Sequence, residues 1–495
     1  MLIPRKNRIA PAFVLVALLL TMVLAACGDN TATTAPATTA AATTAAATTA
    51  AAATTAAGTA TTAAAGTTAA SGTAAAPGTV PAIYTGPAAT VTYMTWENND
   101  TNASLDAAMA LFMKANPNIT VQRVPSPSTD YGQKVNSMLQ AKQLPDIIWS
   151  GNDTEQQFGS QGLLYDWTSK ATSTKTDSFD ISKFAPGSID NWKVGDAATG
   201  KLFGLPTLMN TYGVWYNADA FTKAGLTIPK AGWSYDDMLN AAAKLTTKNG
   251  STNNWGLVNA PYDPFAIGDC SVSSGGAPFA DKINNATKVT IDDKYMACAQ
   301  KYIDAIKAGS LNPPEAAPSG DDATSGFIAG KIPMLYFGQW LAPSFAKAKI
   351  GFKYGFAPLP IAAGGTDVQP YDAVGIISPN TIKSPDAVWA VSQFLASGVW
   401  EQVLPSAPVA PAAYVPSSQP YFDTLNKMGL NSVSDSVNYI LQTKNKQPIR
   451  FTAVYASKAG DILKQWNDIL DGKTDLKSGS ATMVQQLNDL IKSGG

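Results

Sequence analysis

The sequence contains no histidine, and this absence removes several classes of enzyme at once. Neither a Ser-His-Asp triad, nor a Cys-His pair, nor a zinc site with imidazole ligands can form in this chain. Any catalysis would have to depend on carboxylates, and we expect no catalytic residues, no metal site and no cofactor. Cysteine is also scarce, since the 495-residue chain has only three.

Charge is missing from residues 10–26, an apolar run that follows three basic residues among the first eight. A basic start and a short apolar run are typical of a secretory signal peptide, and a membrane-spanning helix would need about 20 apolar residues. The run ends in Leu24-Ala25-Ala26-Cys27, which resembles the bacterial lipobox, whose cysteine becomes acylated. We predict a signal peptide over residues 1–26 and lipidation of Cys27, with an uncleaved membrane anchor as the alternative.

Charged residues are also absent from Asn30 to Trp96, and residues 31–78 are almost wholly Ala and Thr. Side chains this small bury little surface, so the segment cannot offset the entropy of its own ordering. The β-branched Thr and the scattered Gly and Pro oppose a continuous helix. We predict that residues 27–89 are a disordered tether. An Ala-rich helical stalk is the alternative, and either would act as a spacer.

Removal of the leader would leave 32 basic residues (35 minus 3) against 36 acidic residues. No basic stripe that could neutralise phosphates is visible, so no nucleic-acid partner is expected. About 400 residues remain after the tether, which is too many for one core and suits two domains. The 11 Trp and 17 Tyr residues supply flat, amphipathic rings that suit sugar faces as well as protein cores.

Cys270 and Cys298 are the two thiols that remain once Cys27 is lipidated. Outside the cytoplasm, two cysteines of one domain are expected to pair, provided that their Cα atoms come close enough. We therefore predict a disulfide between them, and two buried free thiols are the alternative.

The globular part opens with alternating strands and helices. Period-2 and helical patterns predict, in order, strand 90–96, a helix around 105–113, strand 119–124, helix 131–139 and strand 146–149. This order predicts a parallel sheet. In such sheets ligands bind beyond the carboxyl ends of the strands.

A second α/β unit is predicted from Tyr212 onward. Its expected strands are 214–216, 255–258, 332–337, 354–358 and 373–377. Helices are expected after the cap Ser234, around 295–306, before Gly330, and from the cap Ser384 to Gly398. The Pro- and Ser-rich residues 405–420 are predicted to be irregular, and the C-terminal remainder to be helical.

Short motifs in a fixed order run through the chain from residue 90 to residue 492. They are Leu144 to Ile148, Gly162 to Asp166, Gly200 to Pro206, Trp215 to Phe221, Ala224 to Leu226, Gly330 to Trp340 and Ala357 to Pro360. Each motif is weak alone, but their order and spacing resemble the bacterial extracellular solute-binding proteins of carbohydrate ABC importers, the group that includes maltose-binding protein.

The resemblance implies an α/β, two-lobed periplasmic-binding-protein-like fold. Each lobe would be a mostly parallel sheet flanked by helices, with a ligand cleft between the lobes that closes by a hinge. The N-terminal lobe is expected to comprise residues 90–206 plus about 360–404. The C-terminal lobe would comprise residues 207–359 plus about 405–495.

The same resemblance implies a carbohydrate ligand, permease subunits of an ABC transporter as partners, and no enzymatic activity. With the lipobox, it places the protein on the extracellular side of the cell membrane, held by an N-terminal lipid anchor, or in the periplasm, and we expect a monomer. One departure is visible. Relatives often have glycines before the strand that follows the return crossing, whereas Pro370 to Gly375 put a bulky side chain and a charge on an expected cleft-facing loop.

Ten residues are candidates for ligand contact. Trp340 follows a strand and matches a position where the family commonly places a sugar-stacking aromatic residue, although a Trp that fills the core would look the same. Trp96 and Trp149 end strands on the expected cleft side. Glu97 and Asp153 can accept hydrogen bonds from sugar hydroxyls, unless they cap helices. The others are Asn98, Tyr212 at the first crossing, Tyr371 and Asp372 on the return loop, and Tyr455, where relatives supply an aromatic residue.

Two other functions stay open at this point. An exported carboxylate-dependent glycoside hydrolase would also combine Trp platforms with paired acids. The second alternative is a binder of a non-sugar solute such as a polyamine or an oligopeptide. The order of segments matches binding proteins and no pair of acids stands out. The strand-end Trp residues and the lack of an evident carboxylate cluster argue against a polyamine.

Overall fold

The computed structural model describes residues 79–126, 130–195, 199–249 and 252–494. The predicted signal peptide, Cys27 and the tether as far as residue 78 lie outside the described residues. All described residues fall within the unit Gly72–Gly495. In this described part, every helix is too short or too polar to cross a bilayer.

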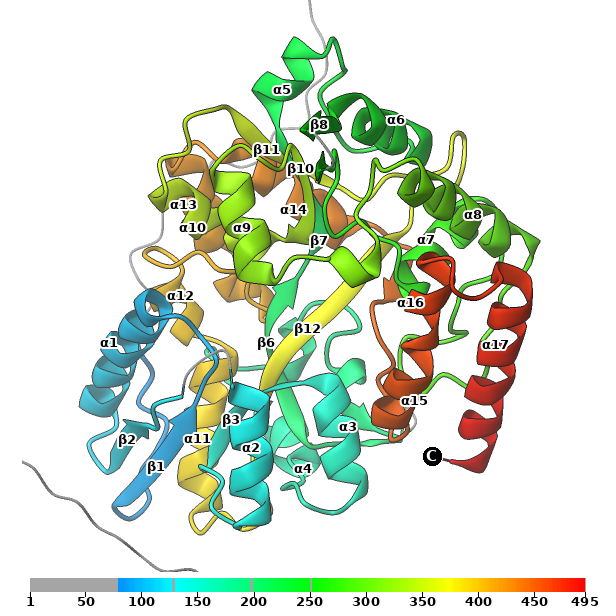
Figure 1. Cartoon of the computed structure of the whole chain (residues 1–495). Helices are drawn as coiled ribbons and strands as arrows, with labels where there is room; N and C mark the ends of the chain where they lie inside the picture. Colours follow the sequence, from blue (N-terminus) through cyan, green and yellow to red (C-terminus); the bar gives the residue numbers. More distant parts are fainter. Residues whose placement is uncertain (1–78, 127–129, 196–198, 250–251, 495) are drawn as a thin grey trace, which may run out of the picture. The chain divides into compact units, whose positions relative to one another are not determined.

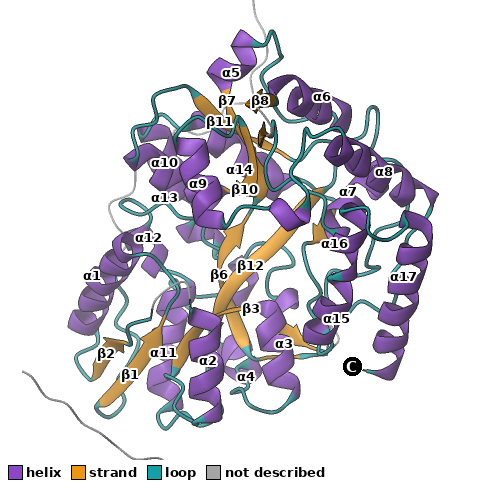
Figure 2. Ribbon diagram, viewed as in Figure 1, coloured by secondary structure: helices purple, strands orange, loops and turns teal. Residues whose placement is uncertain are grey.

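A six-stranded sheet forms the centre of the first lobe (Figures 1 and 2). Its main path runs β13-β12-β3-β1-β2, and β6 also pairs with β12. β1 (Ala89–Met94) pairs in parallel with β2 (Ile119–Arg123) and with β3 (Ile147–Gly151), as the alternation of strands and helices predicts. The carboxyl ends of β1 and β3 therefore meet at one edge of the sheet.

β12 (Gln369–Ile377) is the long yellow strand in Figure 1 and the hub of this sheet. It runs antiparallel to β3 and to β6 (Gly204–Asn210), and parallel to β13 (Lys446–Pro448). All nine of its residues are buried, because neighbouring elements cover both of its faces. The sequence pattern identified only its second half as a strand, and placed Pro370 to Asp372 in a loop. That placement is wrong, since a strand buried on both faces has no polar alternation.

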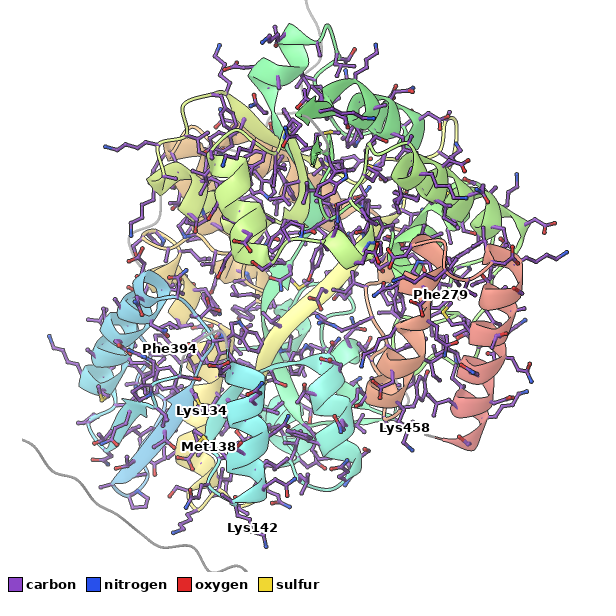
Figure 3. All side chains as sticks on the ribbon, viewed as in Figure 1. Lys134, Met138, Lys142, Phe279, Phe394 and Lys458 are labelled. Carbon is purple, nitrogen blue, oxygen red and sulfur yellow. A yellow bond between two sulfur atoms is a disulfide. The ribbon has the colours of Figure 1, made fainter. Side chains whose placement is uncertain are left out.

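Helices flank the strands of the first lobe, as Figure 2 shows. They are α1 (Asn99–Ala115), α2 (Tyr131–Gln140), α3 (Asn152–Ser160), α4 (Thr168–Ser173), α11 (Pro385–Ala396) and α12 (Val399–Val403). In α1 the Asn98 side chain accepts the Thr101 N–H, and the apolar stripe of the helix is buried. Phe112 of that stripe stacks on Phe394 of α11, labelled in Figure 3, at 5.0 Å between ring centroids.

The second lobe contains a three-stranded sheet in the order β10-β7-β11. β7 (Tyr212–Asn217) pairs antiparallel with both β10 (Met334–Gly338) and β11 (Tyr354–Pro358), so the expectation of a mostly parallel sheet is wrong for this lobe. Val258 forms a parallel bridge with Leu335 of β10, and its N–H donates to the Met334 carbonyl at 3.0 Å. The spacing of hydrophobic residues identifies strands but carries no information on whether neighbouring strands are parallel. That depends on the path of the connections between them.

The helices of the second lobe pack around this sheet and at its side. They are α5 (Ala218–Lys223), α6 (Tyr235–Leu245), α7 (Pro264–Ser273), α8 (Asp293–Lys307), α9 (Gly320–Ile328), α10 (Ala342–Lys347), α13 (Gln419–Lys427), α14 (Asn431–Gln442), α15 (Ala456–Leu463), α16 (Gln465–Leu470) and α17 (Leu476–Ser493). Ser234 caps α6 in a reciprocal capping box with Asp237. The C-terminal part is helical as predicted, apart from the short β13.

Cys270 of α7 and Cys298 of α8 form a disulfide, with their Cα atoms 6.1 Å apart. Both lie in a separate buried cluster of the second lobe that includes Tyr295, Trp466 and Phe279, the last of which is labelled in Figure 3. The disulfide joins two helices that pack on each other, so it closes a chain loop inside one lobe.

Three boundaries differ from the sequence expectation. The globular fold begins before residue 90, because the N–H groups of Ile83 and Tyr84 donate to Asn116 Oδ1 at 2.8 and 3.0 Å. The return to the first lobe comes with β12, since residues 361–366 still hydrogen-bond to the second lobe. Residues 411–414 still lie beside β6 in the first lobe, although the motif order assigned everything after about residue 404 to the second.

Candidate functional site

A cavity of ≈ 610 Å³ is lined by residues of both lobes. The first lobe contributes the segments that follow the carboxyl ends of β1 and β3, where the parallel arrangement places a ligand site. The residues of both lobes that line this first cavity are Trp96, Glu97, Asn98, Gly151, Asp153, Leu208, Asn210, Tyr212, Asp321, Trp340, Asp372, Val374, Val409, Ala410 and Arg450.

The segment after β1 is held rigidly by its own polar contacts. Thr95 Oγ1 accepts the Glu97 N–H at 3.0 Å, and Asn102 Nδ2 donates to the Glu97 carbonyl at 2.6 Å. The ring of Trp96 packs edge-on against Tyr131, with ring centroids 5.3 Å apart. Trp96 is only half-buried, so one part of its indole remains open to the cavity.

Glu97 and Asp153 are the acidic residues of this side. Burial raises the pKa of Glu97 to about 7, and the nearby Trp149 indole opposes part of that rise. At neutral pH the Glu97 carboxyl can therefore both donate and accept hydrogen bonds. Asp153 lies in the first turn of α3, whose N-cap is Gly151, and a Cβ on residue 151 would collide with Asp153 Oδ1. Because Gly151 has no Cβ, the Asp153 carboxylate can occupy this position.

Trp340 enters the cavity from the other lobe. It lies in a 3-10 turn, Gln339–Leu341, directly after β10. Its half-buried indole meets Tyr212 edge-on at 5.3 Å between centroids and Phe337 at 5.7 Å. The turn is anchored by Gln339, which is fully buried and whose Oε1 accepts the Thr211 N–H at 2.7 Å. Trp340 is thus fixed at one edge while it borders the open cavity.

An ion pair lies on the side of the cavity formed by β12. Arg450 Nη2 donates to Asp372 Oδ1 at 2.6 Å, and the Tyr212 hydroxyl donates to Asp372 Oδ2 at 3.3 Å. The Asp372 side chain is 3% exposed and that of Arg450 is 36% exposed. Burial disfavours the charged guanidinium, but Asp372 and then Asp153 more than offset this effect and raise the pKa of Arg450. Arg450 therefore stays charged beside Asp372.

A second cavity of ≈ 460 Å³ shares Tyr212 and Trp340 with the first. It lies entirely on residues of the second lobe and the crossing segment. Its lining residues are Tyr212, Asn259, Ala260, Tyr262, Asp263, Pro314, Ala317, Tyr336, Phe337, Gly338, Trp340 and Asn467. We call the two cavities together the groove. Within the described residues, no group of three or more Cys, Asp or Glu side chains is arranged to hold a metal ion.

A family model described as "Bacterial extracellular solute-binding protein" matches residues 95–398, which is more than half of the 495 residues. The chain belongs to this family. Among curated relatives of this solute-binding protein, YcjN of Escherichia coli (strain K12) is 25% identical over 249 residues, covering 50% of this chain and 54% of YcjN. The maltodextrin-binding protein MdxE of Bacillus subtilis (strain 168) is 24% identical over 251 residues. That match covers 49% of this chain and 54% of MdxE, so the chain spans about half the length of these relatives.

Solved structures agree on the fold. The ABC substrate-binding protein Lmo0181 of Listeria monocytogenes, in complex with cycloalternan, matches with a TM-score of 0.68 at 21% identity, covering 81% of this chain and 99% of Lmo0181. The GacH receptor of Streptomyces glaucescens matches with a TM-score of 0.65 at 20% identity, covering 82% of this chain and 100% of the receptor. The predicted two-lobed α/β fold is confirmed. The family and these neighbours are binding proteins rather than enzymes, and the family is periplasmic or extracellular.

The fold of this solute-binding protein brings seven of the ten candidate residues to the first cavity. They are Trp96, Glu97, Asn98, Asp153, Tyr212, Trp340 and Asp372. Asn98 is also the cap of α1, and Tyr212 also packs at the crossing between the lobes. Asn98 and Tyr212 can therefore cap or pack a structural element and border the cavity at the same time.

The other three candidates lie in the hydrophobic interior rather than at the cavity. Trp149 is 1% exposed within the first core, where its ring centroid lies 6.2 Å from that of Tyr93. Tyr371 is buried in β12, with its hydroxyl 3.5 Å from the Pro186 carbonyl. The Tyr455 hydroxyl donates to the Ala286 carbonyl in the second core. These three aromatic residues pack the two lobes.

Sequence reasoning missed four polar residues of the groove. Arg450 follows the short strand β13, and Asn210 ends β6. Asp321 lies in the first turn of α9, and Asp263 caps α7. The last two resemble ordinary helix-capping or first-turn acids in the sequence. No local pattern distinguishes any of the four, because their positions depend on contacts between segments that are distant in the chain.

Proposed function

We propose that the protein captures a carbohydrate between its two lobes and delivers it to the permease subunits of an ABC transporter. The observation that carries this proposal is the first cavity, which residues of both lobes line together. A ligand that contacts both lobes binds the closed arrangement more tightly than the open one, and this difference drives closure.

The chemistry of the cavity suits a sugar. The indoles of Trp96 and Trp340 offer flat apolar surfaces, one from each lobe, for the C–H faces of a pyranose ring. Glu97, Asp153 and Asn210 offer directional hydrogen-bonding groups for hydroxyls. The names of similar proteins support the same class, since one is a maltodextrin-binding protein and another is described in complex with cycloalternan.

A carbohydrate panel tests the proposal by thermal shift and calorimetry on the purified protein. A ligand that binds only the folded state stabilises it by about 2.7 kcal/mol at 100 times its dissociation constant, so a true ligand raises the melting temperature in proportion to the logarithm of its concentration. We expect at least one mono- or oligosaccharide to do so. A panel without any such sugar, together with a shift caused by a polyamine or a peptide, would contradict a carbohydrate ligand.

Recovery of the ligand separates binding from hydrolysis. The bound sugar is incubated with the protein for many hours and then analysed for chain length. Unchanged sugar is expected of a binding protein. Released shorter products that depend on Glu97 or Asp153 would indicate a glycoside hydrolase with paired carboxylates instead.

We further propose that Cys27 carries the lipid anchor and that residues 28–78 space the globular part from the outer surface of the membrane. The lipobox-like Leu24-Ala25-Ala26-Cys27 after the basic, apolar leader supports this. The parent chain is expected to sediment with membranes, and Cys27→Ala is expected to shift the protein to the soluble fraction. Equal membrane association of the two proteins would contradict the anchor.

A further inference from the structure

The second cavity has aromatic walls. The centroid of Tyr212 lies 5.3 Å from that of Trp340 and 6.3 Å from that of Tyr336. Its five lining rings belong to Tyr212, Tyr262, Tyr336, Phe337 and Trp340. Ring faces carry negative electrostatic potential and attract cations, including protonated amines, most strongly where water is excluded.

Asp263 is the single charged side chain among the described residues that line this second cavity. As the N-cap of α7, its Oδ1 accepts the N–H groups of Phe265 at 3.0 Å and of Ala266 at 3.2 Å. Both contacts use the same oxygen, so Oδ2 remains for a ligand. The residue is exposed, so its carboxylate is accessible from the cavity. Desolvation by the surrounding protein raises the pKa of Asp263, and a cationic partner would favour its charged form. An anchored carboxylate beside ring faces is the arrangement that recognises an organic cation.

The charge of the whole groove favours a cation as well. Five carboxylates line it, those of Glu97, Asp153, Asp263, Asp321 and Asp372, against the one guanidinium of Arg450. Among the described residues, Asp372 is the only one of the five carboxylates that takes part in an ion pair. Glu97 can take up a proton and Asp153 interacts with Arg450, but Asp263 and Asp321 have no cation beside them among the described residues of the groove. Closure over a neutral ligand would enclose these two carboxylates without a counter-charge, which is unfavourable. A positively charged ligand offsets that penalty.

We propose that the groove takes a carbohydrate bearing a protonated amine, with the amine in the second cavity between the rings of Tyr212, Tyr336 and Trp340 and the Asp263 carboxylate. This inference rests on the proposed carbohydrate function and makes its substrate class more specific. The sugar ring or rings lie in the first cavity, between Trp96 and Trp340. The selectivity for an amino sugar comes from the second cavity.

Matched sugars that differ at one substituent test the inference on the purified protein. Each set contains three sugars that differ at one carbon, which carries a hydroxyl, a primary amine or an N-acetyl group. Sets are made from monosaccharides and from dimers of several linkages. Binding is measured calorimetrically at low salt and at a pH where the amine is protonated. In at least one set we expect the amine to bind about 10-fold more tightly than both neutral members, with the preference reduced at high salt.

Two pairs of variants locate the selectivity. Asp263→Asn retains a good N-cap for α7 but removes the charge, so the amine preference is expected to fall to about 3-fold or less. Asp475→Asn makes the same change at the N-cap of α17, away from the groove, and should leave the preference unchanged. Tyr336→Phe keeps the ring and the preference, whereas Tyr336→Leu removes both.

The outcomes separate this inference from the proposed function. If neutral sugars bind as tightly as their amine counterparts, the carboxylates serve as hydroxyl acceptors and the inference is overturned while the carbohydrate function stands. If no sugar of any set binds, the inference is overturned, and the wider carbohydrate panel decides whether the proposed function stands. If the amine is preferred but Asp263→Asn and Asp475→Asn behave alike, the amine lies elsewhere and the proposed cavity is wrong.

Discussion

Replacement of Trp340 by alanine should weaken sugar binding while it leaves most of the folding stability intact. The indole borders both cavities and is half-buried, so its removal deletes one stacking face of the groove without opening a hole in a core. A buried aromatic contact contributes about 1 to 3 kcal/mol, which corresponds to a loss of about 5-fold to 150-fold in affinity. The contacts with Tyr212 and Phe337 are lost as well. We therefore expect a decrease of about 1 to 2 kcal/mol in the free energy of unfolding.

Trp149→Ala is the matched control, because Trp149 is the candidate that the fold places in the core. Its side chain is 1% exposed, so truncation creates a cavity and should cost about 3 to 5 kcal/mol of stability. Trp149→Phe is a milder change at the same position, because it keeps an aromatic ring in the core. Neither change removes a group that lines the groove.

Both quantities are measured on each variant, affinity by calorimetry and stability by urea unfolding. The reasoning predicts opposite rankings, with Trp340→Ala worse in affinity and Trp149→Ala worse in stability. Unchanged sugar affinity in Trp340→Ala, combined with a loss of stability as large as that of Trp149→Ala, would refute the assignment of Trp340 to the binding site.

Three further predictions concern the stability of the lobes. Replacing Cys270 and Cys298 together by alanine should lower the free energy of unfolding by about 3 to 4 kcal/mol, because the disulfide closes a loop of 28 positions. A change below about 1 kcal/mol in urea unfolding would contradict this. Burial raises the pKa of Glu155 well above its ordinary 4.5. The folded carboxyl keeps a proton that the unfolded chain releases as the pH rises above about 4.5. The free energy of unfolding therefore decreases as the pH rises from there toward the pKa of the folded state, and melting curves of Glu155→Gln should lack that decrease. Asp372→Asn leaves Arg450 without its counter-charge and should lower the free energy of unfolding by about 2 kcal/mol or more. In a double-mutant cycle, the double variant Asp372→Asn with Arg450→Met should recover part of this loss.

The sequence determined the parts of this protein that depend on local pattern. The helical stripe of α1, the capping box of α6 and the strand β10 follow from periods and caps within a few residues, so they could be read from the chain directly. Trp96 and Glu97 were also predictable, because they follow the carboxyl end of a strand that pairs in parallel with its neighbours, at the edge where ligands bind. Trp340 was predicted from the resemblance to the family, since β10 belongs to an antiparallel sheet.

Other features were decided only by the tertiary structure. All nine residues of β12 are buried, and four of the five residues of β3 are, so neither strand shows the alternation that would tell which side chains face the cavity. The sequence therefore could not distinguish Trp149, which fills the core, from Trp96, which borders the groove. The pairing of Asp372 with Arg450 joins residues 78 positions apart.

The carboxylates of the groove show the same division. The sequence shows no acidic cluster, because Glu97, Asp153, Asp263 and Asp321 are each separated by more than fifty residues and belong to different elements. Folding brings them to adjoining cavities, and with them the local excess of negative charge. Local sequence determined where the helices form, because helix hydrogen bonds and caps join residues close in the chain. The charge and shape of the binding groove were fixed by the packing of the two lobes, because these properties sum over residues that meet only in three dimensions.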